Sequence, residues 1–166
     1  SALGYHNKFR LPVIVVRLFN TVGARQTGQY GMVIPRFVQQ ALRNQDLIVH
    51  GNGKQRRCFT DVSDVVTGLS SLMESEEAVG KIFNIGSTNE ISIIELAKKI
   101  VRQVNSSSSI KFSNYKEIYG VDIEDMQRRI PSLDHIYKVV GYIPTVDLDQ
   151  CIDNVITYYT QRSNKD

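Results

Sequence analysis

The 166-residue sequence has no tryptophan, two cysteines and three histidines. Cys58 and Cys151 stand far apart and do not form the short-spaced pairs that bind zinc. Such sparse cysteines suit a reducing compartment, and the sequence leaves a disulfide between them open. His6, His50 and His135 lack the His-x-x-x-His spacing of a metal site. We therefore expect no metal.

Long apolar runs are also absent. No segment approaches the roughly 20 apolar residues of a membrane helix, and the sequence carries no signal peptide. We expect a cytoplasmic chain with no membrane partner. Twenty basic and 17 acidic residues give a net charge of +3, too little to indicate a nucleic-acid partner. The length and a hydrophobic content of 42% predict one globular domain with a substantial core.

The most informative stretch begins at Val13. Residues Val13 to Phe19 are apolar except for Arg17, and four of them are valine or isoleucine. This pattern predicts a strand buried on both faces. Asn20 opens the loop that follows, and ligands of open α/β sheets bind at the carboxyl ends of strands. Asn20 is therefore a candidate binding residue, with strand capping as the alternative.

The rest of the chain alternates between helical periodicity and short apolar runs. Such alternation indicates an α/β or α+β fold. Ser92 and Glu95 have the spacing of a capping box, and residues 51–53 predict a turn from which residues 55–59 return as a strand. Residues 115–129 predict an irregular, charged surface segment. Helices are expected at residues 2–9, 34–43, 62–73, 93–104, 131–141 and 148–159, and the other strands at 47–50, 82–85 and 110–112.

Arginines in three places could bind an anion. Arg25 follows the first strand, Arg56 and Arg57 follow the turn at 51–53, and Arg128 and Arg129 precede Pro131. Guanidinium groups pair bidentately with phosphate oxygens, so arginines that converge on one strand end would clamp a diphosphate. The alternative for each arginine is a solvated surface position.

No set of residues has the pattern of a catalytic site. Ser63 and Asp64 have no histidine nearby in the sequence, so a hydrolase triad is poorly supported. The acidic residues at 122–125 lack the glycine and glutamate of a calcium loop. Gly51-x-Gly53 lacks the third glycine of a dinucleotide fingerprint. We therefore assign no catalytic and no cofactor-binding residue.

Several motifs in register nevertheless resemble one family, the NAD-dependent epimerases/dehydratases. These extended short-chain dehydrogenase/reductases act on nucleotide sugars and include UDP-glucose 4-epimerases and UDP-glucuronate decarboxylases. The chain resembles their C-terminal half. The matching segments are Leu11-Pro-Val, Arg17-Leu-Phe-Asn-Thr-Val-Gly-Ala-Arg25, Gly31-Met-Val-Ile-Pro-Arg-Phe37, Leu47 to Phe59, Val62-Ser-Asp64, Phe83-Asn-Ile-Gly86, Ser92-Ile-Ile-Glu-Leu-Ala97, Arg129-Ile-Pro131 and Val140-Gly-Tyr-Ile-Pro144.

The resemblance implies a fold and a division of the chain. The expected fold class is α/β, with the last strand of a Rossmann-type sheet and a small mixed α/β domain that binds the nucleotide sugar. Residues 1–25 would hold the tail of a helix and the last Rossmann strand. Residues 26–166 would form the nucleotide-sugar-binding domain, and the N-terminal NAD-binding part of the family is absent from this sequence.

The resemblance also implies substrate-binding roles. Relatives often have tyrosine where this chain has His50, and they often have proline where it has Ala24. The resemblance selects Arg57 and Arg129 and leaves Arg56 and Arg128 as expected surface residues. The diphosphate contacts fall on Asn20, Arg57 and Arg129, and the base contacts on Met32, Val33, Val49 and His50.

Two family motifs are missing from the sequence. It has no Gly-x-x-Gly-x-x-Gly loop for NAD, and none of its eight tyrosines has lysine four residues later. In the family, the tyrosine of that pair is the acid–base, and the lysine lowers its pKa. The resemblance thus implies that the full-length parent is an NAD-dependent, homodimeric enzyme. This chain alone is expected to bind no cofactor and to be inactive.

The first functional hypothesis is the nucleotide-sugar-binding portion of a 4-epimerase, with a UDP-sugar favoured by the frequency of uridine in the family. A UDP-glucuronate decarboxylase or a 4,6-dehydratase is the alternative within the family. Two hypotheses of other classes remain: a stand-alone module that binds nucleotide sugars without catalysis, and an interaction domain whose arginines bind an acidic partner.

Overall fold

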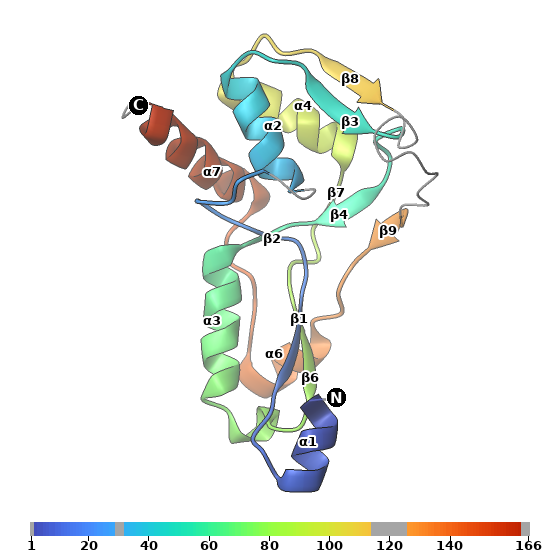
Figure 1. Ribbon diagram of the computed structural model, residues 1–166, viewed down its shortest axis with the longest axis vertical. Coiled ribbons are helices and arrows are strands. Elements are labelled where there is room, and N and C mark those ends of the chain that lie inside the picture. The colour runs from blue at the N-terminus through green and yellow to red at the C-terminus, as the bar shows by residue number, and fades with distance from the viewer. Residues whose placement is uncertain (1, 29–31, 114–125, 164–166) are drawn as a thin grey trace.

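The computed structural model (Figure 1) describes residues 2–28, 32–113 and 126–163. Their helices and strands alternate along the chain, as the sequence predicts. The elements are α1 (Ala2–Phe9), β1 (Val15–Leu18), β2 (Thr21–Val22), α2 (Val33–Leu42), β3 (Leu47–His50), β4 (Arg56–Cys58), β5 (Thr60–Asp61), α3 (Val62–Met73), the 3-10 helix η1 (Glu76–Ala78), β6 (Ile82–Ile85), β7 (Glu90–Ser92), α4 (Ile93–Val104), β8 (Ile110–Ser113), β9 (Arg128–Arg129), α6 (Asp134–Val140) and α7 (Leu148–Ser163).

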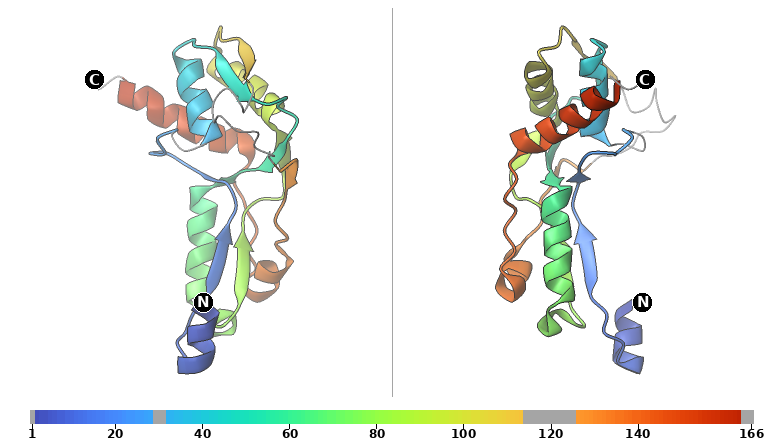
Figure 2. Two further views of the ribbon diagram at one scale, coloured as in Figure 1. Left: turned by 45° about the vertical axis from the view of Figure 1, so that its right-hand side comes forward. Right: turned by 90° about the vertical axis from the view of Figure 1, so that its left-hand side faces the viewer.

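The molecule is elongated and has two hydrophobic clusters. The upper cluster in Figure 1 lies among α2, α4, α7 and β3, where Phe37, Leu47 and Leu96 are fully buried. The lower cluster joins α3, α6 and β6 through Leu72, Ile136 and other buried side chains. Figure 2 shows the same separation from two further directions, with the N-terminus in the lower part and the C-terminal end in the upper part.

These clusters draw on segments from both sides of residue 25. Val16 of β1 packs against the lower cluster, but most of that cluster comes from α3, β6 and α6. β1 pairs with β6 in parallel, with Val16 opposite Phe83. The domain boundary after residue 25 remains a prediction, and the packing shows that the two clusters interleave along the chain.

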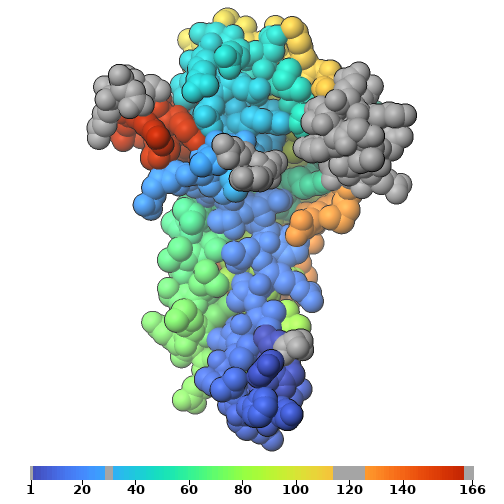
Figure 3. Space-filling model, viewed as in Figure 1, coloured from blue at the N-terminus to red at the C-terminus, as the bar shows by residue number. Residues whose placement is uncertain are grey.

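The expectation that Val13 to Phe19 would be a strand buried on both faces is wrong. β1 covers only Val15–Leu18, and Arg17 and Leu18 are exposed. Among the described residues β1 pairs only with β6, so one strand edge is open. The space-filling view shows this narrow lower part, with α1 and β1 at the surface (Figure 3). The apolar sequence of the strand therefore exceeds what the lower cluster covers.

The expected hairpin of residues 47–50 and 55–59 is also wrong. β3 pairs with β8 in parallel, whereas β4 pairs with β7 and β9. The N-terminus of α4 explains the difference, because Ile94 N–H donates to the Gly53 carbonyl at 3.0 Å and Ile93 N–H to the Gln55 carbonyl at 3.2 Å. The chain after the turn is thus bound to α4 and cannot fold back along β3.

Local helix signals in the sequence were reliable. Asp61 caps α3 by accepting from the Ser63 N–H at 2.9 Å, and Ser92 and Glu95 form the expected capping box at α4. α6 ends at Gly141 in the left-handed conformation, as predicted, but begins at Asp134 instead of Pro131. Within the described residues, no helix has the length and apolar character needed to cross a membrane.

Most of the predicted irregular segment at 115–129 lies outside the described residues. Its described end, residues 126–129, contains β9, which the sequence did not predict. Two consecutive arginines have no apolar alternation that would mark a strand. β9 forms because β4 offers it an edge, with the Arg56 N–H donating to the Gln127 carbonyl at 2.9 Å.

Candidate functional site

Four of the predicted anion-binding arginines meet in one small sheet. β4 is its central strand, with β7 antiparallel on one side and β9 parallel on the other. Arg56 lies opposite Arg128 and Arg57 lies opposite Arg129 in the β4–β9 register. Because successive side chains of a strand point to opposite faces, this register sorts the arginines into two pairs on two faces.

The first face carries Arg56 and Arg128 together with acidic partners. The Glu90 carboxylate accepts from Arg128 Nε and Nη2, both at 2.9 Å. The same carboxylate lies 3.8 Å from Arg56 Nε, and Glu95 lies 3.8 Å from Arg56 Nη1. The hydrogen bonds from Arg128 are the main reason why the pKa of Glu90 is below its usual value. This face is neutralised by the protein itself.

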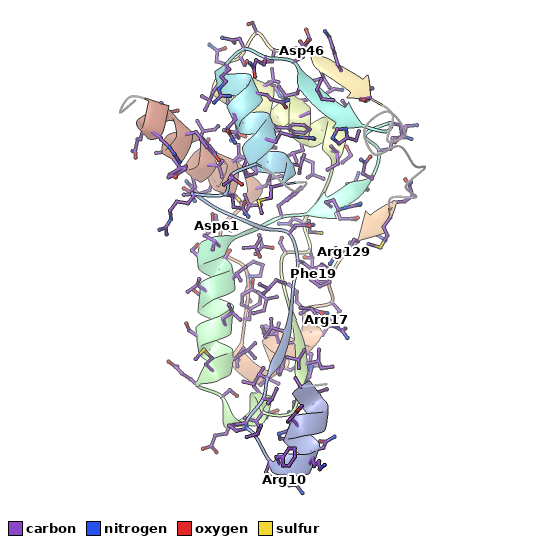
Figure 4. The ribbon with its side chains drawn as sticks, in the orientation of Figure 1. Arg10, Arg17, Phe19, Asp46, Asp61 and Arg129 are labelled. Atoms are coloured by element: carbon purple, nitrogen blue, oxygen red, sulfur yellow. The ribbon has the colours of Figure 1, made fainter. Side chains whose placement is uncertain are left out.

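The second face carries Arg57 and Arg129, the two arginines that the family resemblance selected. Arg57 is half-buried, and its Nη1 donates to the Met126 carbonyl at 2.7 Å and the Arg56 carbonyl at 2.8 Å. The exposed guanidinium of Arg129 lies over the ring of Phe19, 5.0 Å from the ring centre. Figure 4 shows Arg129 beside Phe19, where β1 ends. The structure thus brings both arginines to the carboxyl end of β1.

Asn20 follows Phe19 and is tied to the same sheet. Its Nδ2 donates to the Cys58 carbonyl of β4 at 2.8 Å, and its own carbonyl accepts from the Thr60 N–H at 3.2 Å. Its φ of 28° lies in the left-handed region, which asparagine tolerates better than most residues. Asn20 therefore does end the strand β1 and fix the turn after it, as the alternative interpretation of the sequence expected. Nδ2 carries two hydrogens, and no described residue accepts the second, so Asn20 can also donate to a ligand.

The four residues predicted to contact the base lie on other elements, at the start of α2 and at the end of β3. Met32 is the exposed N-cap of α2, and Val33 begins that helix. Val49 is fully buried in the upper cluster, so it supports the neighbouring surface from within and does not itself line it. His50 is half-buried at the end of β3, and its Nε2 lies 2.6 Å from Arg36 Nη1. Burial and then the charge of Arg36 lower the pKa of His50.

The arginine contact suits a neutral His50 ring, because a guanidinium donates and Nε2 must then accept. Arg36 also donates from Nη2 to the Ile48 carbonyl at 3.1 Å, which links α2 to β3. The sequence did not single out Arg36. The apolar spacing of α2 predicts which residues face the core, but it does not tell whether an arginine between them is solvated or bonded to another element.

Arg25 follows Ala24 with a positive φ of 74° and an exposed side chain. It is not one of the four arginines of the β4 sheet, which are residues 56, 57, 128 and 129. No group of three histidine, cysteine or carboxylate side chains that could hold a metal ion occurs in the described residues. Both cysteines are buried as free thiols.

Comparison with known proteins identifies the family. The family model for GDP-mannose 4,6 dehydratase matches residues 1–155. The chain belongs to this family. The extended short-chain dehydrogenase/reductase resemblance inferred from the motifs is therefore confirmed.

The chain is 39% identical over 155 residues to a UDP-N-acetyl-alpha-D-glucosaminuronate decarboxylase of Bacillus cytotoxicus, a match that covers 93% of the chain and 48% of the relative. It is 36% identical over 160 residues to UDP-glucuronic acid decarboxylase 2 of Arabidopsis thaliana, covering 96% of the chain and 34% of the relative. The chain thus spans half or less of the length of these curated relatives.

Solved structures support the same fold. An epimerase of Methanothermobacter thermautotrophicus superposes with a TM-score of 0.89 at 26% identity, covering 98% of this chain and 47% of that one. The UDP-glucuronic acid 4-epimerase of Bacillus cereus, solved with UDP-glucuronic acid and NAD, has a TM-score of 0.85 at 24% identity, covering 96% and 48%. The predicted α/β fold class of Rossmann-type enzymes is confirmed.

Proposed function

We propose that the chain is the nucleotide-sugar-binding portion of an NAD-dependent enzyme acting on UDP-sugars, and that Arg57 and Arg129 bind the diphosphate. One observation carries this proposal: the β4–β9 register sets these two arginines opposite each other. Like charges directly opposite each other in a sheet destabilise it. An anion held between the two guanidinium groups would remove that repulsion and gain charge-assisted hydrogen bonds.

Asn20 supports the same location for the diphosphate. Its amide is fixed on the Cys58 carbonyl of the strand that carries Arg57, and Phe19 beside it supports Arg129. The three proposed diphosphate ligands thus come from β1's end, β4 and β9, which the fold joins. We propose that the base lies along Met32, Val33, Val49 and His50, with His50 as a neutral ring held by Arg36.

The reaction of the whole protein is proposed from its relatives. The two curated relatives described above carry the names of decarboxylases of UDP-uronates. We therefore propose a UDP-uronate as the substrate class and decarboxylation as the reaction. A 4-epimerase, which the motifs alone placed first, is the second candidate because the epimerase of Methanothermobacter thermautotrophicus superposes with a TM-score of 0.89.

The described residues do not fit an NAD pyrophosphate site. The helices that directly follow strands are α3 and α4, and a pyrophosphate would need their N-terminal N–H groups. Both ends are capped by the protein itself: at α3 Asp61 accepts from the Ser63 N–H, and at α4 the Ser92 hydroxyl accepts from the Glu95 N–H while Glu95 accepts from the Ser92 N–H. We propose that NAD binding, the acid–base tyrosine and the homodimer contacts need residues outside this sequence, and that this chain alone has no turnover.

Calorimetric titration with UDP, UDP-glucose and UDP-glucuronate tests the proposal. Arg129→Ala should weaken UDP binding about 10- to 100-fold, since a hydrogen bond to a charged group contributes about 1.5–3 kcal/mol. Arg102→Ala, which removes an exposed arginine of α4, is the matched control and should bind as the wild type does. Arg57→Ala should lose as much or more, because Arg57 also holds the Met126 carbonyl.

Tighter binding of UDP-glucuronate than of UDP-glucose would support a UDP-uronate as the substrate class, and equal binding would contradict it. The proposed diphosphate site is refuted if the folded wild type binds UDP and Arg129→Ala binds it equally well. Turnover of UDP-glucuronate with added NAD by this chain alone would refute its proposed inactivity.

A further inference from the structure

β9 is held in place with little help from apolar contacts. It has two residues, both exposed arginines. Beyond the backbone pairing with β4, its N-terminal side is fixed by Arg57 Nη1 on the Met126 carbonyl. A strand this short and exposed has almost no hydrophobic stabilisation of its own. Its register therefore depends on a few polar contacts.

The strongest side-chain contact of β9 comes from the far side of the sheet. Glu90 belongs to β7, which does not neighbour β9 because β4 lies between them. Glu90 is opposite Cys58 in the β4–β7 register, whereas Arg128 is opposite Arg56. The bidentate contact of Arg128 with Glu90 at 2.9 Å thus crosses β4 diagonally. It connects both outer strands over one face of the sheet.

The geometry of this bridge matters for the opposite face. Arg128 and Arg129 are consecutive, so fixing one on the first face fixes where the other emerges on the second. The Glu90 side chain is only 16% exposed while that of Arg128 is 67% exposed, so the carboxylate is the more rigid partner. The bidentate geometry also sets the orientation of Arg128 about its guanidinium plane.

We propose that Glu90 is a positioning residue for the diphosphate site: by chelating Arg128 it holds β9 in the register that sets Arg129 beside Arg57. This inference rests on the proposed function. Glu90 does not itself contact the ligand, because it lies on the opposite face of the sheet from Arg57 and Arg129. It also offsets the repulsion between Arg56 and Arg128, which would otherwise separate β9 from β4.

The test combines UDP titration with amide hydrogen exchange of residues 126–130. Glu90→Gln keeps the shape of the side chain and removes its charge. We expect about tenfold weaker UDP binding and faster exchange in β9, with unchanged exchange in β3 and β8. Glu77→Gln is the control for the loss of one carboxylate, since it breaks an ion pair with Lys81 outside the β4 sheet, and it should change neither measurement. Arg128→Lys should give an intermediate loss, because lysine cannot chelate a carboxylate bidentately.

Charge reversal separates positioning from a general effect on the fold. The double variant Glu90→Arg with Arg128→Glu restores an ion pair and should recover UDP affinity to within about threefold of the wild type. Glu90→Gln with wild-type affinity and wild-type exchange would overturn the inference, as would a loss that the double variant does not recover. If the wild type binds no UDP, the proposed function fails, and β9 exchange in Glu90→Gln still decides whether Glu90 anchors the strand.

Discussion

Asp64 connects the two parts of the molecule, and its removal should strongly destabilise the chain. The carboxylate is 5% exposed near the start of α3. It accepts from the Thr145 N–H at 3.0 Å, the Thr145 hydroxyl at 2.8 Å and the Val146 N–H at 3.0 Å. Thr145 and Val146 lie between α6 of the lower cluster and α7 of the upper cluster. These three bonds therefore bind that connection to α3.

The magnitude follows from the number and environment of the bonds. A hydrogen bond to a charged group contributes about 1.5–3 kcal/mol. Thr145 is exposed, so water can replace part of the loss, and we use the lower figure for each bond. Asp64→Ala should then lower the free energy of unfolding by about 4.5 kcal/mol. For a chain of this size, that corresponds to a fall in Tm of about 9–18 °C.

Urea unfolding followed by circular dichroism measures the effect, with thermal unfolding as a second assay. Asp149→Asn is the matched control because its exposed carboxylate binds Lys99 at the surface; it should cost less than about 1 kcal/mol. Asp64→Asn should fall between the two, since it keeps one acceptor oxygen. A change below about 1 kcal/mol for Asp64→Ala would refute the reasoning.

Three further predictions concern other parts of the fold. Burial first, and then the charge of Asp64, raises the pKa of Tyr142 to about 12. The folded state therefore favours the neutral phenol, and this contribution to the free energy of unfolding is complete below pH 10 and lost between pH 10 and 12. Tyr142→Phe should remove this pH dependence of the free energy of unfolding over that range. Ser92→Ala removes the capping box of α4 and should cost about 1–2 kcal/mol in urea unfolding. Leu18 is 48% exposed on the open β1 strand, so Leu18→Lys should reduce aggregation measured by light scattering without lowering Tm; equal aggregation would contradict this role of the strand.

Local signals in the sequence were enough for most helices. The helix predicted at residues 93–104 has the bounds of α4, because its apolar spacing and the Ser92–Glu95 box are encoded within a few residues. The same holds for α3, which begins after the Asp61 cap. Arginine could also be proposed from the sequence as the residue type of a candidate anion site, since the chemistry of a guanidinium does not depend on the fold.

The sequence could not decide how the strands pair. Residues 47–50 and 55–59 suggested a hairpin because they flank a glycine turn, but α4 takes up the carbonyls of Gly53 and Gln55. β9 could not be predicted, because two arginines have no strand signal in the sequence and form a strand only by pairing with β4. Contacts between such distant segments depend on the whole chain.

The sequence by itself determined the family, the helices and the arginines at issue. Only the tertiary structure decided which arginines face together, because one residue of register exchanges the faces of a strand. Arg57 and Met126 are 69 positions apart in the chain yet in direct contact. In the fold, Arg128 therefore pairs with Glu90, whereas Arg129 lies beside Arg57 and Phe19. Two adjacent identical residues carry no local signal that would distinguish these two roles.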